Sequence, residues 1–438
     1  MKKVGIIGGG ICGLSAALAL KENRINFKLF ESSENIGGAF KTIHDFDCIL
    51  EHGPNSINSS NDDLKKIINF LNLEDECLYA NILSKNRFIV KNKKIIPIPL
   101  SFKDFIKTKL FSTRAKLRLF KEPFIKSKSL NNESLNDFIL RRFGKEILDY
   151  AVNPFVKGIY AGDPKRLSAK SSFPKLIRIE KEYGSILNGM IKMKKNEKKS
   201  SARIFTFKNG MHTLPKEIEK HIKSSIKYNS PVNQISKTSS GNWLIYGEEF
   251  TDVIFTQPSY RFNNFRAPFD VSVFKQIYCP PITTVNLLYK KNQITHDLDG
   301  FGLLIPECEK MFILGVLFPS VIFKNRSPEN LILLTVYVGG SNHPDRALLS
   351  KEELIRKIEL DLKVLIGLDG TSLKDSHYIW NQAIPQYDLN IDKVHKRIEE
   401  LENLNKGIYF SGNYRSGISI PNAISSGYNT ANKIVKSK

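Results

Sequence analysis

The chain has 438 residues and a mass of 49.8 kDa, more than one hydrophobic core usually supports, so two or three packed units are expected. Its composition, 41% hydrophobic and 25% charged, is that of a folded protein, and five scattered cysteines without a CxxC pair argue against a disulfide framework and against a metal site. The formal net charge of +22 favours an anionic partner, but no zinc-finger or RRM-type motif accompanies it, which argues against nucleic acid.

Strand, turn and helix signals follow one another at the N-terminal end. Residues 4–7 predict a buried parallel strand, and G-x-G-x-x-G follows at Gly8, Gly10 and Gly13 before a run with helical spacing. In this pattern the first glycine permits the tight turn, the second leaves room for a pyrophosphate, and the third lets helix and strand pack closely. The segment therefore predicts a Rossmann-type dinucleotide-binding unit.

A second predicted strand, residues 27–30, ends in Glu31. This position is near the separation of about twenty residues from the glycines that is expected for a ribose-binding acid. A carboxylate there accepts hydrogen bonds from ribose hydroxyls and disfavours a 2′-phosphate.

Two further glycine-bearing segments follow where a simple NAD domain would enter a helix, namely residues 37–42 and 51–56. The Gly-Gly pair resembles the second glycine motif of the amine-oxidase-like FAD family, in which the extended dinucleotide lies along the chain. The resemblance implies FAD as the cofactor. It also implies contacts from Gly37, Gly38, Lys41, Thr42, Gly53, Pro54, Asn55 and Ser56. Ala39 departs from the pattern, since a basic or bulky residue is common there, and Lys41 is the residue that would compensate.

Residues 85–203 predict a mainly helical and very basic insertion. Between residues 102 and 121, Lys and Arg alternate with Phe and Leu, which favours a helix pair lying on an anionic membrane. The alternative is a solvated helical insertion with one face on the core. The lysine-rich run 190–201 predicts a loop.

The middle of the chain predicts strands and the start of a second domain. Strand-like alternation covers residues 205–214 and 231–255, and Pro215 opens a helix. If the family comparison holds there, Val232 places its backbone against the adenine. Strands at 280–290, 300–306, 312–316 and 331–340, with an amphipathic helix at 351–365, predict a mixed-sheet substrate domain.

The C-terminal end completes the nucleotide unit. Residues 407–411 predict a strand, and a helix over 422–435 has Pro421 in its first turn. The N-terminus of this helix is expected to face the flavin, where its positive dipole end favours negative charge on the ring. Between them lie the expected cofactor residues Gly412, Asn413, Gly417, Ile418 and Ser419.

These elements predict an α/β fold, α+β overall, with a discontinuous FAD-binding domain. Its segments are residues 1–84, 204–258 and 405–438. The basic insertion is assigned to 85–203 and the sheet-based substrate domain to 259–404.

Several motifs in order make the chain resemble the protoporphyrinogen oxidase family, the oxygen-dependent porphyrinogen oxidases of haem synthesis, over nearly its whole length. The motifs are residues 51–56, 86–88, 153–164, 300–302, 384–387 and 412–414. The resemblance implies that porphyrinogen methylenes lose hydride to the flavin and that molecular oxygen reoxidises it, giving a porphyrin and hydrogen peroxide. His52, beside Glu51, is interpreted as structural, because the cofactor carries the chemistry.

The same resemblance assigns substrate contacts. Arg87 matches a residue that pairs with a propionate, which suits guanidinium geometry. Gly158 would lie where the backbone passes the macrocycle, and Leu304 and Tyr337 would sandwich the ring. The alternatives are a surface arginine on a strand and ordinary core packing.

Other functions stay open on the sequence alone. A coproporphyrinogen oxidase of the same family, an amine oxidase and a carotenoid desaturase share the nucleotide signals, and so does a non-catalytic lipid carrier of the GDP-dissociation-inhibitor type. We expect a cytoplasmic protein, peripheral on the cytoplasmic face of the membrane at most, and the family resemblance implies a homodimer.

Overall fold

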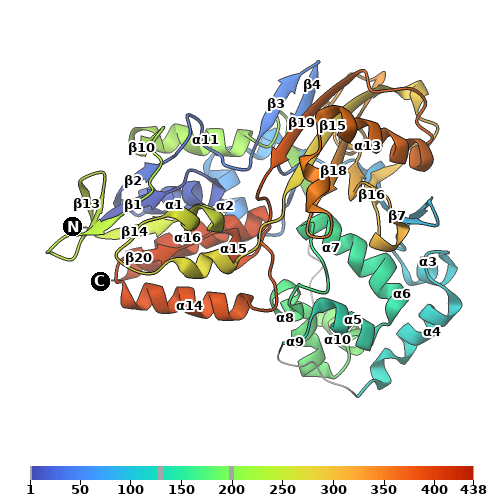
Figure 1. Cartoon of the computed structure of the whole chain (residues 1–438), viewed down its shortest axis with the longest axis horizontal. Coiled ribbons are helices and arrows are strands. Elements are labelled where there is room, and N and C mark those ends of the chain that lie inside the picture. The colour runs from blue at the N-terminus through green and yellow to red at the C-terminus, as the bar shows by residue number, and fades with distance from the viewer. Residues whose placement is uncertain (1, 127–131, 197–201, 438) are drawn as a thin grey trace.

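The computed structural model describes residues 2–126, 132–196 and 202–437, and it has two lobes (Figure 1). The left-hand lobe contains both chain ends and a five-stranded sheet. The right-hand lobe contains a seven-stranded sheet above a group of helices.

The five-stranded sheet is parallel throughout, which is the arrangement of a Rossmann-type unit. Its order is β10 (Ile226–Lys227), β2 (Asn26–Phe30), β1 (Lys3–Ile7), β14 (Asp252–Phe255) and β20 (Ile408–Phe410). The N-terminal strand is therefore central and the C-terminal strand is an edge. The strands predicted at 4–7, 27–30 and 407–411 are confirmed.

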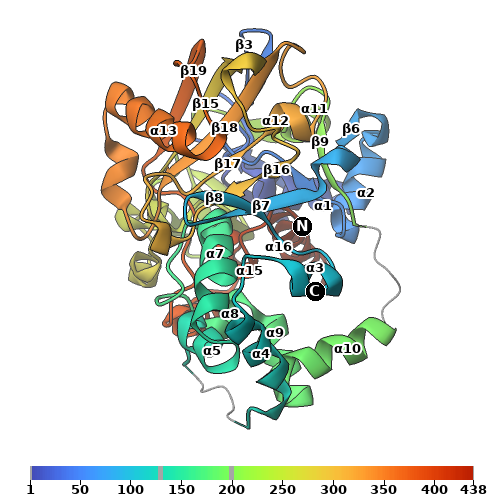
Figure 2. The same cartoon turned by 90° about the vertical axis from the view of Figure 1, so that its right-hand side faces the viewer.

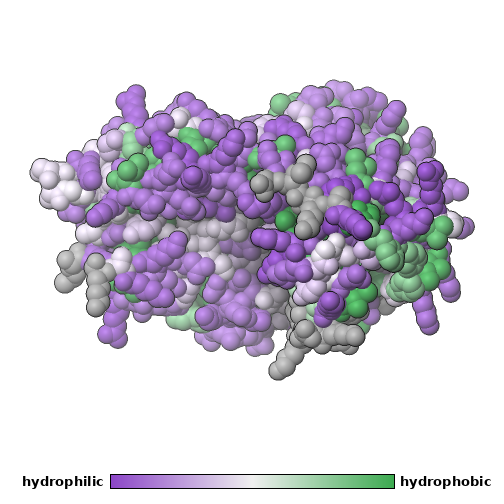
Figure 3. Space-filling model, turned by 90° about the horizontal axis from the view of Figure 1, so that it is seen from below, coloured by the Kyte–Doolittle hydropathy of each residue, from purple (hydrophilic) through white to green (hydrophobic). Residues whose placement is uncertain are grey.

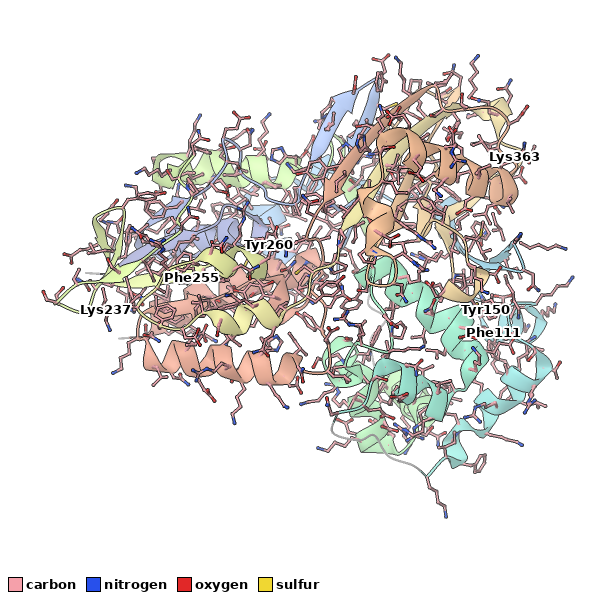
Figure 4. All side chains as sticks on the ribbon, viewed as in Figure 1. Phe111, Tyr150, Lys237, Phe255, Tyr260 and Lys363 are labelled. Carbon is pink, nitrogen blue, oxygen red and sulfur yellow. The ribbon has the colours of Figure 1, made fainter. Side chains whose placement is uncertain are left out.

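Side chains alternate between the two faces of this sheet and bury both of them. Val4 and Ile6 pack in one apolar cluster with α1 (Ile11–Glu22), α11 (Thr213–Ile222) and α16 (Ile420–Lys436). Ile7 and Phe255 pack in another with α14 (Ile391–Leu404) and the small antiparallel sheet of β11 (Ser236–Lys237), β12 (Trp243–Ile245) and β13 (Glu248–Phe250). Figure 4 labels Phe255 inside this lobe.

Helices α1 and α16, one near each end of the chain, pack against each other. A Cβ at Gly427 would lie 2.0 Å from the carbonyl oxygen of Cys12, so the helices cross with their backbones in contact. Any residue larger than glycine at this crossing would push the helices apart.

The seven-stranded sheet is mixed. Its order is β19 (Lys374–Trp380), β15 (Ile282–Lys290), β18 (Leu331–Gly339), β17 (Gly315–Leu317), β16 (Gly300–Leu304), β7 (Asn86–Lys91) and β8 (Lys94–Pro97). Every neighbouring pair is antiparallel except β16 with β7. One face packs against α13 (Lys351–Ile366) through an apolar cluster that includes Val336 and Ile358. The other face lies over α7 (Asn153–Tyr160), as Figure 2 shows.

The helical part of the right-hand lobe is built from short helices. They are α3 (Phe102–Lys107), α4 (Thr113–Lys121), α5 (Leu135–Arg142), α6 (Lys145–Ile147), α7, α8 (Ala169–Ser172), α9 (Pro174–Tyr183) and α10 (Ile186–Asn196). The labelled side chains of Phe111 and Tyr150 lie together where this group meets the sheet (Figure 4).

The structure corrects the prediction for residues 85–203 at both ends. The segment opens with strands β7 and β8 of the mixed sheet rather than with helix. The loop predicted from residue 190 is wrong as far as residue 196, because α10 continues to Asn196; residues 197–201 lie outside the described part of the chain. The division into domains stays a prediction.

Two strand predictions are also too long. The strand predicted over 205–214 is β9 (Ile204–Phe207), which pairs with β5 (Ile57–Asn58) and β6 (Cys77–Tyr79), and a turn follows it. The strand predicted at 312–316 begins only at Gly315, because the backbone N–H groups of Phe312 and Ile313 both donate to the Asp361 carboxylate, at 2.7 and 3.0 Å.

Further elements are the hairpin of β3 (Thr42–Asp45) and β4 (Cys48–Glu51), together with α2 (Asp62–Phe70) and α12 (Pro319–Ile322). Within the described ranges, no helix is both long and apolar enough to cross a bilayer.

Candidate active site

The first glycine motif forms a backbone-lined cradle at the end of β1. Gly8 has a φ of +113°, and a Cβ at Gly13 would lie 2.0 Å from the Gly8 carbonyl oxygen, so both positions need glycine. A Cβ at Gly10 would meet nothing within 4 Å. The space beside Gly10 is therefore open to a group that approaches the helix N-terminus of α1.

Glu31 is held at this cradle. One carboxylate oxygen accepts a hydrogen bond from Gly9 N at 2.7 Å, and the other accepts from the backbone N and the hydroxyl of Ser33, at 2.9 and 2.8 Å. The side chain is buried. Its carboxylate thus lies beside the glycine turn, at the place where a ribose hydroxyl would compete for it.

The second glycine motif runs alongside the first. Gly37 N donates to Gly9 O at 2.8 Å, and a Cβ at Gly38 would lie 3.1 Å from the Cα of Gly10. Gly37 and Gly38 have φ values of +108° and +59°, a conformation that favours glycine. Two adjacent backbone turns without side chains leave a continuous groove along the chain.

Thr42 and Lys41, two predicted cofactor residues beside this groove, both contact other residues of the protein. The Thr42 hydroxyl donates to Glu51 at 2.9 Å and accepts from His212 N at 2.9 Å, so it fixes the hairpin. The Lys41 ammonium lies 5.0 Å from the ring centroid of Tyr378, on the side of the mixed sheet. Its compensation for Ala39 stays a prediction.

Gln257, next to the cradle, has a buried donor that no partner satisfies within the described ranges. Its side-chain Nε2 is one of the buried atoms without a hydrogen bond, and its backbone N would lie 3.1 Å from a Cβ at Gly8. An unmet buried donor costs free energy unless a ligand or water satisfies it. Val232, buried, follows Ser230, whose backbone N donates to Glu31 O at 2.7 Å. The glycine groove, Glu31 and this free donor fit an extended dinucleotide.

The C-terminal loop meets the same edge of the sheet. Gly412 N donates to the Ser426 hydroxyl at 3.2 Å, and the Ser411 hydroxyl lies 3.2 Å from the Cys12 sulfur. Ser419 caps α16 by accepting from Asn422 N at 3.3 Å. The loop with the predicted cofactor residues of the C-terminal end therefore lies beside α1, the helix that carries Gly13 of the first glycine motif.

Residues 51–56 pass from this lobe onto the mixed sheet. Asn286 Nδ2 donates to Glu51 O at 3.2 Å, and Trp380 Nε1 donates to His52 O at 3.0 Å. Asn55 Nδ2 donates to the Tyr337 hydroxyl at 2.9 Å. A predicted cofactor residue thus contacts a predicted substrate residue directly.

Glu51 and His52 are both buried at this junction. The Glu51 carboxylate accepts from Met211 N at 2.7 Å, and burial raises its pKa to about 7. Burial lowers the pKa of His52 to about 4, and its Nε2 lies 2.9 Å from the Ser376 hydroxyl. His52 is therefore neutral at pH 7 and occupied by neighbours, which agrees with a structural role.

Leu304 and Tyr337 lie on one face of the mixed sheet. In register across three antiparallel strands, Leu304 is opposite Gly315, which is opposite Tyr337. Residues directly opposite each other share a face, so the two side chains flank a position without a side chain. A Cβ at Gly315 would lie 3.1 Å from Leu304 Cδ2, so the Leu304 side chain covers the backbone at Gly315.

Arg87 belongs to the same face. Ile89 is in register with Leu304, and Arg87 lies two residues before Ile89 on β7, so its side chain points to the same side. Arg87 is exposed, and its guanidinium carbon lies 5.1 Å from the ring centroid of Phe301.

Gly158 approaches this face from α7. A Cβ there would lie 2.6 Å from Leu304 Cδ2. The residue was expected to be glycine because a side chain would meet the macrocycle, whereas the structure shows that Leu304 is met first. All four predicted substrate residues nevertheless converge on this surface; their contacts with substrate stay predictions.

An ion pair that the sequence did not indicate holds α7 against the sheet. The buried Lys157 ammonium lies 2.7 Å from Glu307, whose side chain is partly exposed, and Asn153 accepts from Glu307 N at 2.8 Å. His343 Nε2 contacts the other Glu307 oxygen at 2.6 Å. Lys157 and Asn153 are 150 and 154 residues from Glu307, so no local spacing could reveal these contacts.

Comparison with known proteins agrees with this geometry. The family described as flavin-containing amine oxidoreductase matches residues 11–435. The mitochondrial protoporphyrinogen oxidase of Nicotiana tabacum is 33% identical, covering 99% of this chain and 95% of its own. The coproporphyrinogen III oxidase of Bacillus subtilis is 27% identical, covering 97% and 96%.

Solved structures agree on the fold. A structure from Exiguobacterium sp. 255-15, assigned provisionally to protoporphyrinogen oxidase, superposes with a TM-score of 0.86 at 21% identity, covering 100% of this chain and 99% of its own. The predicted fold class is confirmed.

Proposed function

This chain belongs to the flavin-containing amine oxidoreductase family, and from that premise we propose that protoporphyrinogen is its substrate. The chain is an FAD-dependent oxidase. The hydrogen bond between Asn55 and Tyr337 carries the proposal furthest, because it joins the flavin loop to the face on which the substrate residues converge. A substrate on this face beside Tyr337 would lie next to the cofactor.

The protein's part in the reaction is to bind and orient. Bound FAD supplies a hydride acceptor. Arg87 presents an exposed guanidinium that can bind a propionate with two parallel hydrogen bonds. Leu304 and Tyr337 hold the macrocycle between them and keep a methylene carbon aligned with the flavin. His52 is neutral and hydrogen-bonded to Ser376, so no role as a base is assigned to it.

Protoporphyrinogen is favoured over coproporphyrinogen by what surrounds Arg87. The neighbouring side chains on this face are apolar, namely Ile89, Leu304 and Phe301. The two vinyl groups of protoporphyrinogen suit such neighbours. The two additional propionates of coproporphyrinogen would lose their hydration there without gaining a charged partner. Coproporphyrinogen is the second candidate, because a relative of that name matches 97% of the chain.

Molecular oxygen is the proposed final acceptor, with one hydrogen peroxide formed for each pair of hydrogens removed. This balances the electrons, since oxygen takes both electrons and both protons. The proposed site of action is the cytoplasm, at the cytoplasmic face of the membrane. Assembly as a homodimer stays a prediction.

The surface of α3 and α4 supports the membrane part of the proposal. Phe102, Leu117 and Phe120 are exposed, and Phe124, just after α4, is 81% exposed. Exposed lysines and arginines lie among them, at Lys103, Lys107, Lys109, Arg114 and Lys121. Figure 3 shows apolar residues gathered toward the end of the molecule where Figure 1 places α3 and α4. Apolar side chains inside a basic rim suit an anionic bilayer surface.

A steady-state assay tests the function. The purified holoenzyme is given protoporphyrinogen or coproporphyrinogen, and porphyrin fluorescence, oxygen uptake and peroxide are followed together. We expect porphyrin from protoporphyrinogen at a higher kcat/KM. Turnover of a primary amine without porphyrin formation would indicate an amine oxidase instead, and a colourless protein that releases no flavin would indicate a lipid carrier.

A further inference from the structure

One tyrosine outside the glycine motifs spans the flavin-facing loop. Tyr387 lies between β19 and α14, and its hydroxyl donates to Asn413 O at 2.7 Å while accepting from Gly417 N at 2.7 Å. The side chain is buried, and burial raises the pKa of its hydroxyl well above the ordinary value. The hydroxyl therefore keeps the proton that it donates to Asn413.

The two backbone groups that Tyr387 holds are the ends of one short turn. Between them lies α15 (Asn413–Ser416), a single helical turn, which is too short to be stable alone. Gly417 has a φ of +107°, so regular structure stops there. A side chain from elsewhere must therefore supply the hydrogen bonds that fix this turn, and the Tyr387 hydroxyl supplies one at each end.

The stretch that carries Tyr387 is also fastened to the substrate helix. Gln386 Nε2 donates to Tyr160 O at 2.8 Å, at the C-terminal end of α7. Ser168 N donates to Tyr387 O at 2.8 Å. The same α7 carries Gly158, which lies against Leu304. Residues 386–387 thus connect the substrate helix with the flavin-facing loop.

We propose that Tyr387 is a positioning residue that sets the loop 412–417, and with it the N-terminus of α16, relative to the substrate helix α7. The inference rests on the FAD site and on the proposed orientation of α16, not on which porphyrinogen is oxidised. Its effect on the reaction is indirect, because the hydroxyl holds the loop that keeps the flavin ring aligned with the substrate carbon.

The test replaces only this hydroxyl. In Tyr387→Phe, Asn413 O and Gly417 N lose this partner, while the contacts of the loop with His395 and Ser426 remain. The loop is therefore loosened at the end that leads into α16. We expect the dissociation constant for FAD to rise about tenfold or more, which is the usual consequence of unmet buried polar groups. The midpoint potential of the flavin should fall, by about 30 mV for each tenfold loss of preference for the reduced form. kcat should fall about tenfold with KM little changed, because alignment is lost rather than substrate contact.

A matched control lies on the α13 side of the mixed sheet. Tyr289 is also fully buried, and its hydroxyl donates to Glu359 on α13 at 3.2 Å, away from the flavin-facing loop. Tyr289→Phe makes the same chemical change and also removes a hydrogen bond. It should leave FAD affinity, flavin potential and kcat unchanged.

Hydrogen exchange of the wild-type holoenzyme keeps the test independent of mutant folding. The Gly417 amide should exchange slowly. An amide that exchanges at the rate of an open loop would overturn the inference, and so would a Tyr387→Phe enzyme whose FAD affinity and potential equal those of Tyr289→Phe. A wild-type protein that binds no FAD would instead remove the proposed function.

Discussion

Arg87 shows how one residue can be placed by a sheet and still be free to bind. Its backbone is part of β7, where Ile98 N donates to Arg87 O at 2.7 Å, while its guanidinium only stacks on Phe301. No hydrogen bond or ion pair of the guanidinium occurs within residues 2–126, 132–196 and 202–437. The charge is therefore available to a substrate carboxylate.

Arg87→Ala should weaken substrate binding without disturbing the cofactor. Loss of a charge-assisted hydrogen-bond pair predicts a KM for protoporphyrinogen about tenfold to a hundredfold higher, with the flavin spectrum unchanged. Arg87→Lys keeps the charge but not the paired geometry, so it should be intermediate. Steady-state kinetics with all three proteins measure this, and an unchanged KM in Arg87→Ala would remove Arg87 from the site.

His52 predicts how the pH dependence of stability arises at the junction. Its pKa is lowered from 6.5 to about 4 in the folded protein, mainly by burial. The unfolded chain therefore takes up a proton that the folded chain rejects, and the contribution of His52 to stability is lost as pH falls from about 6.5 to about 4.

His52→Gln should flatten the loss of stability over that window, since glutamine does not titrate. Urea denaturation at pH 4.5, 5.5 and 7 measures the free energy of unfolding, with exposed His44→Gln as the control. Equal losses of stability in wild type and His52→Gln between pH 7 and pH 4.5 would contradict this role of His52.

At this scale, local spacing predicts that the glycines and Glu31 lie together, because turn, helix and acid follow each other between residues 8 and 31, and the structure places the Glu31 carboxylate 2.7 Å from Gly9 N. Their contacts with a cofactor stay predictions. It cannot predict that Tyr387 holds Gly417, or that Leu304 meets Gly158. The fold brings these residues together from distant parts of the sequence. A motif match singles out such residues but does not say which other residues they contact.

At the scale of elements, the helical part of the right-hand lobe depends on a buried charge network. Glu122 accepts hydrogen bonds from the Ser185 hydroxyl at 2.6 Å and from Ile186 N at 3.0 Å, at the start of α10, and pairs with Arg142 at 3.2 Å. Glu122 and Arg142 are both fully buried. One carboxylate thus joins α5 to the N-terminal end of α10.

Glu122→Ala should strongly destabilise this group of helices. The substitution removes one of the carboxylates that neutralise the buried Arg142 charge, and it removes the acceptor at the start of α10. The free energy of unfolding should therefore fall by about 3–5 kcal/mol. Urea denaturation gives the loss, and hydrogen exchange should show it first in α10. Glu182→Gln, at an exposed position on α9, is the control. A loss no larger than that of the control would contradict the role of the network.

The strand errors at this scale have physical causes. β7 pairs with β16, more than two hundred residues later, and β8 joins the sheet through β7, so the basic local composition is a poor guide to both strands. The residues before Gly315 look like a strand, but Asp361 takes the N–H groups of Phe312 and Ile313 from another element. By contrast, β1, β2, β15 and β18 are apolar enough to be predicted from their own residues.

At the scale of the whole molecule, the two lobes present different surfaces. The apolar and basic surface of α3 and α4 belongs to the right-hand lobe, on the side away from both chain ends (Figure 1). A membrane there would leave the left-hand lobe in solution.

Vesicle binding tests this orientation. The holoenzyme should bind phosphatidylserine vesicles more tightly than phosphatidylcholine vesicles, and the preference should shrink as salt screens the lysines. Phe124→Ser should weaken vesicle binding about tenfold, which is the usual effect of removing one aromatic side chain that the membrane would bury. Phe70→Ser, on α2 of the other lobe, is the control. Equal binding to both vesicles, or equal effects of the two variants, would rule out this surface.

The central claim is that FAD, bound at the meeting of the two chain ends, accepts hydride from a porphyrinogen held on the mixed sheet. Anaerobic mixing of the holoenzyme with protoporphyrinogen, and separately with coproporphyrinogen, tests it in a single turnover by following the flavin absorbance. We predict rapid bleaching with protoporphyrinogen, slower bleaching with coproporphyrinogen, and recovery of the flavin colour when oxygen is admitted. A bound flavin that stays oxidised with both porphyrinogens would contradict the account.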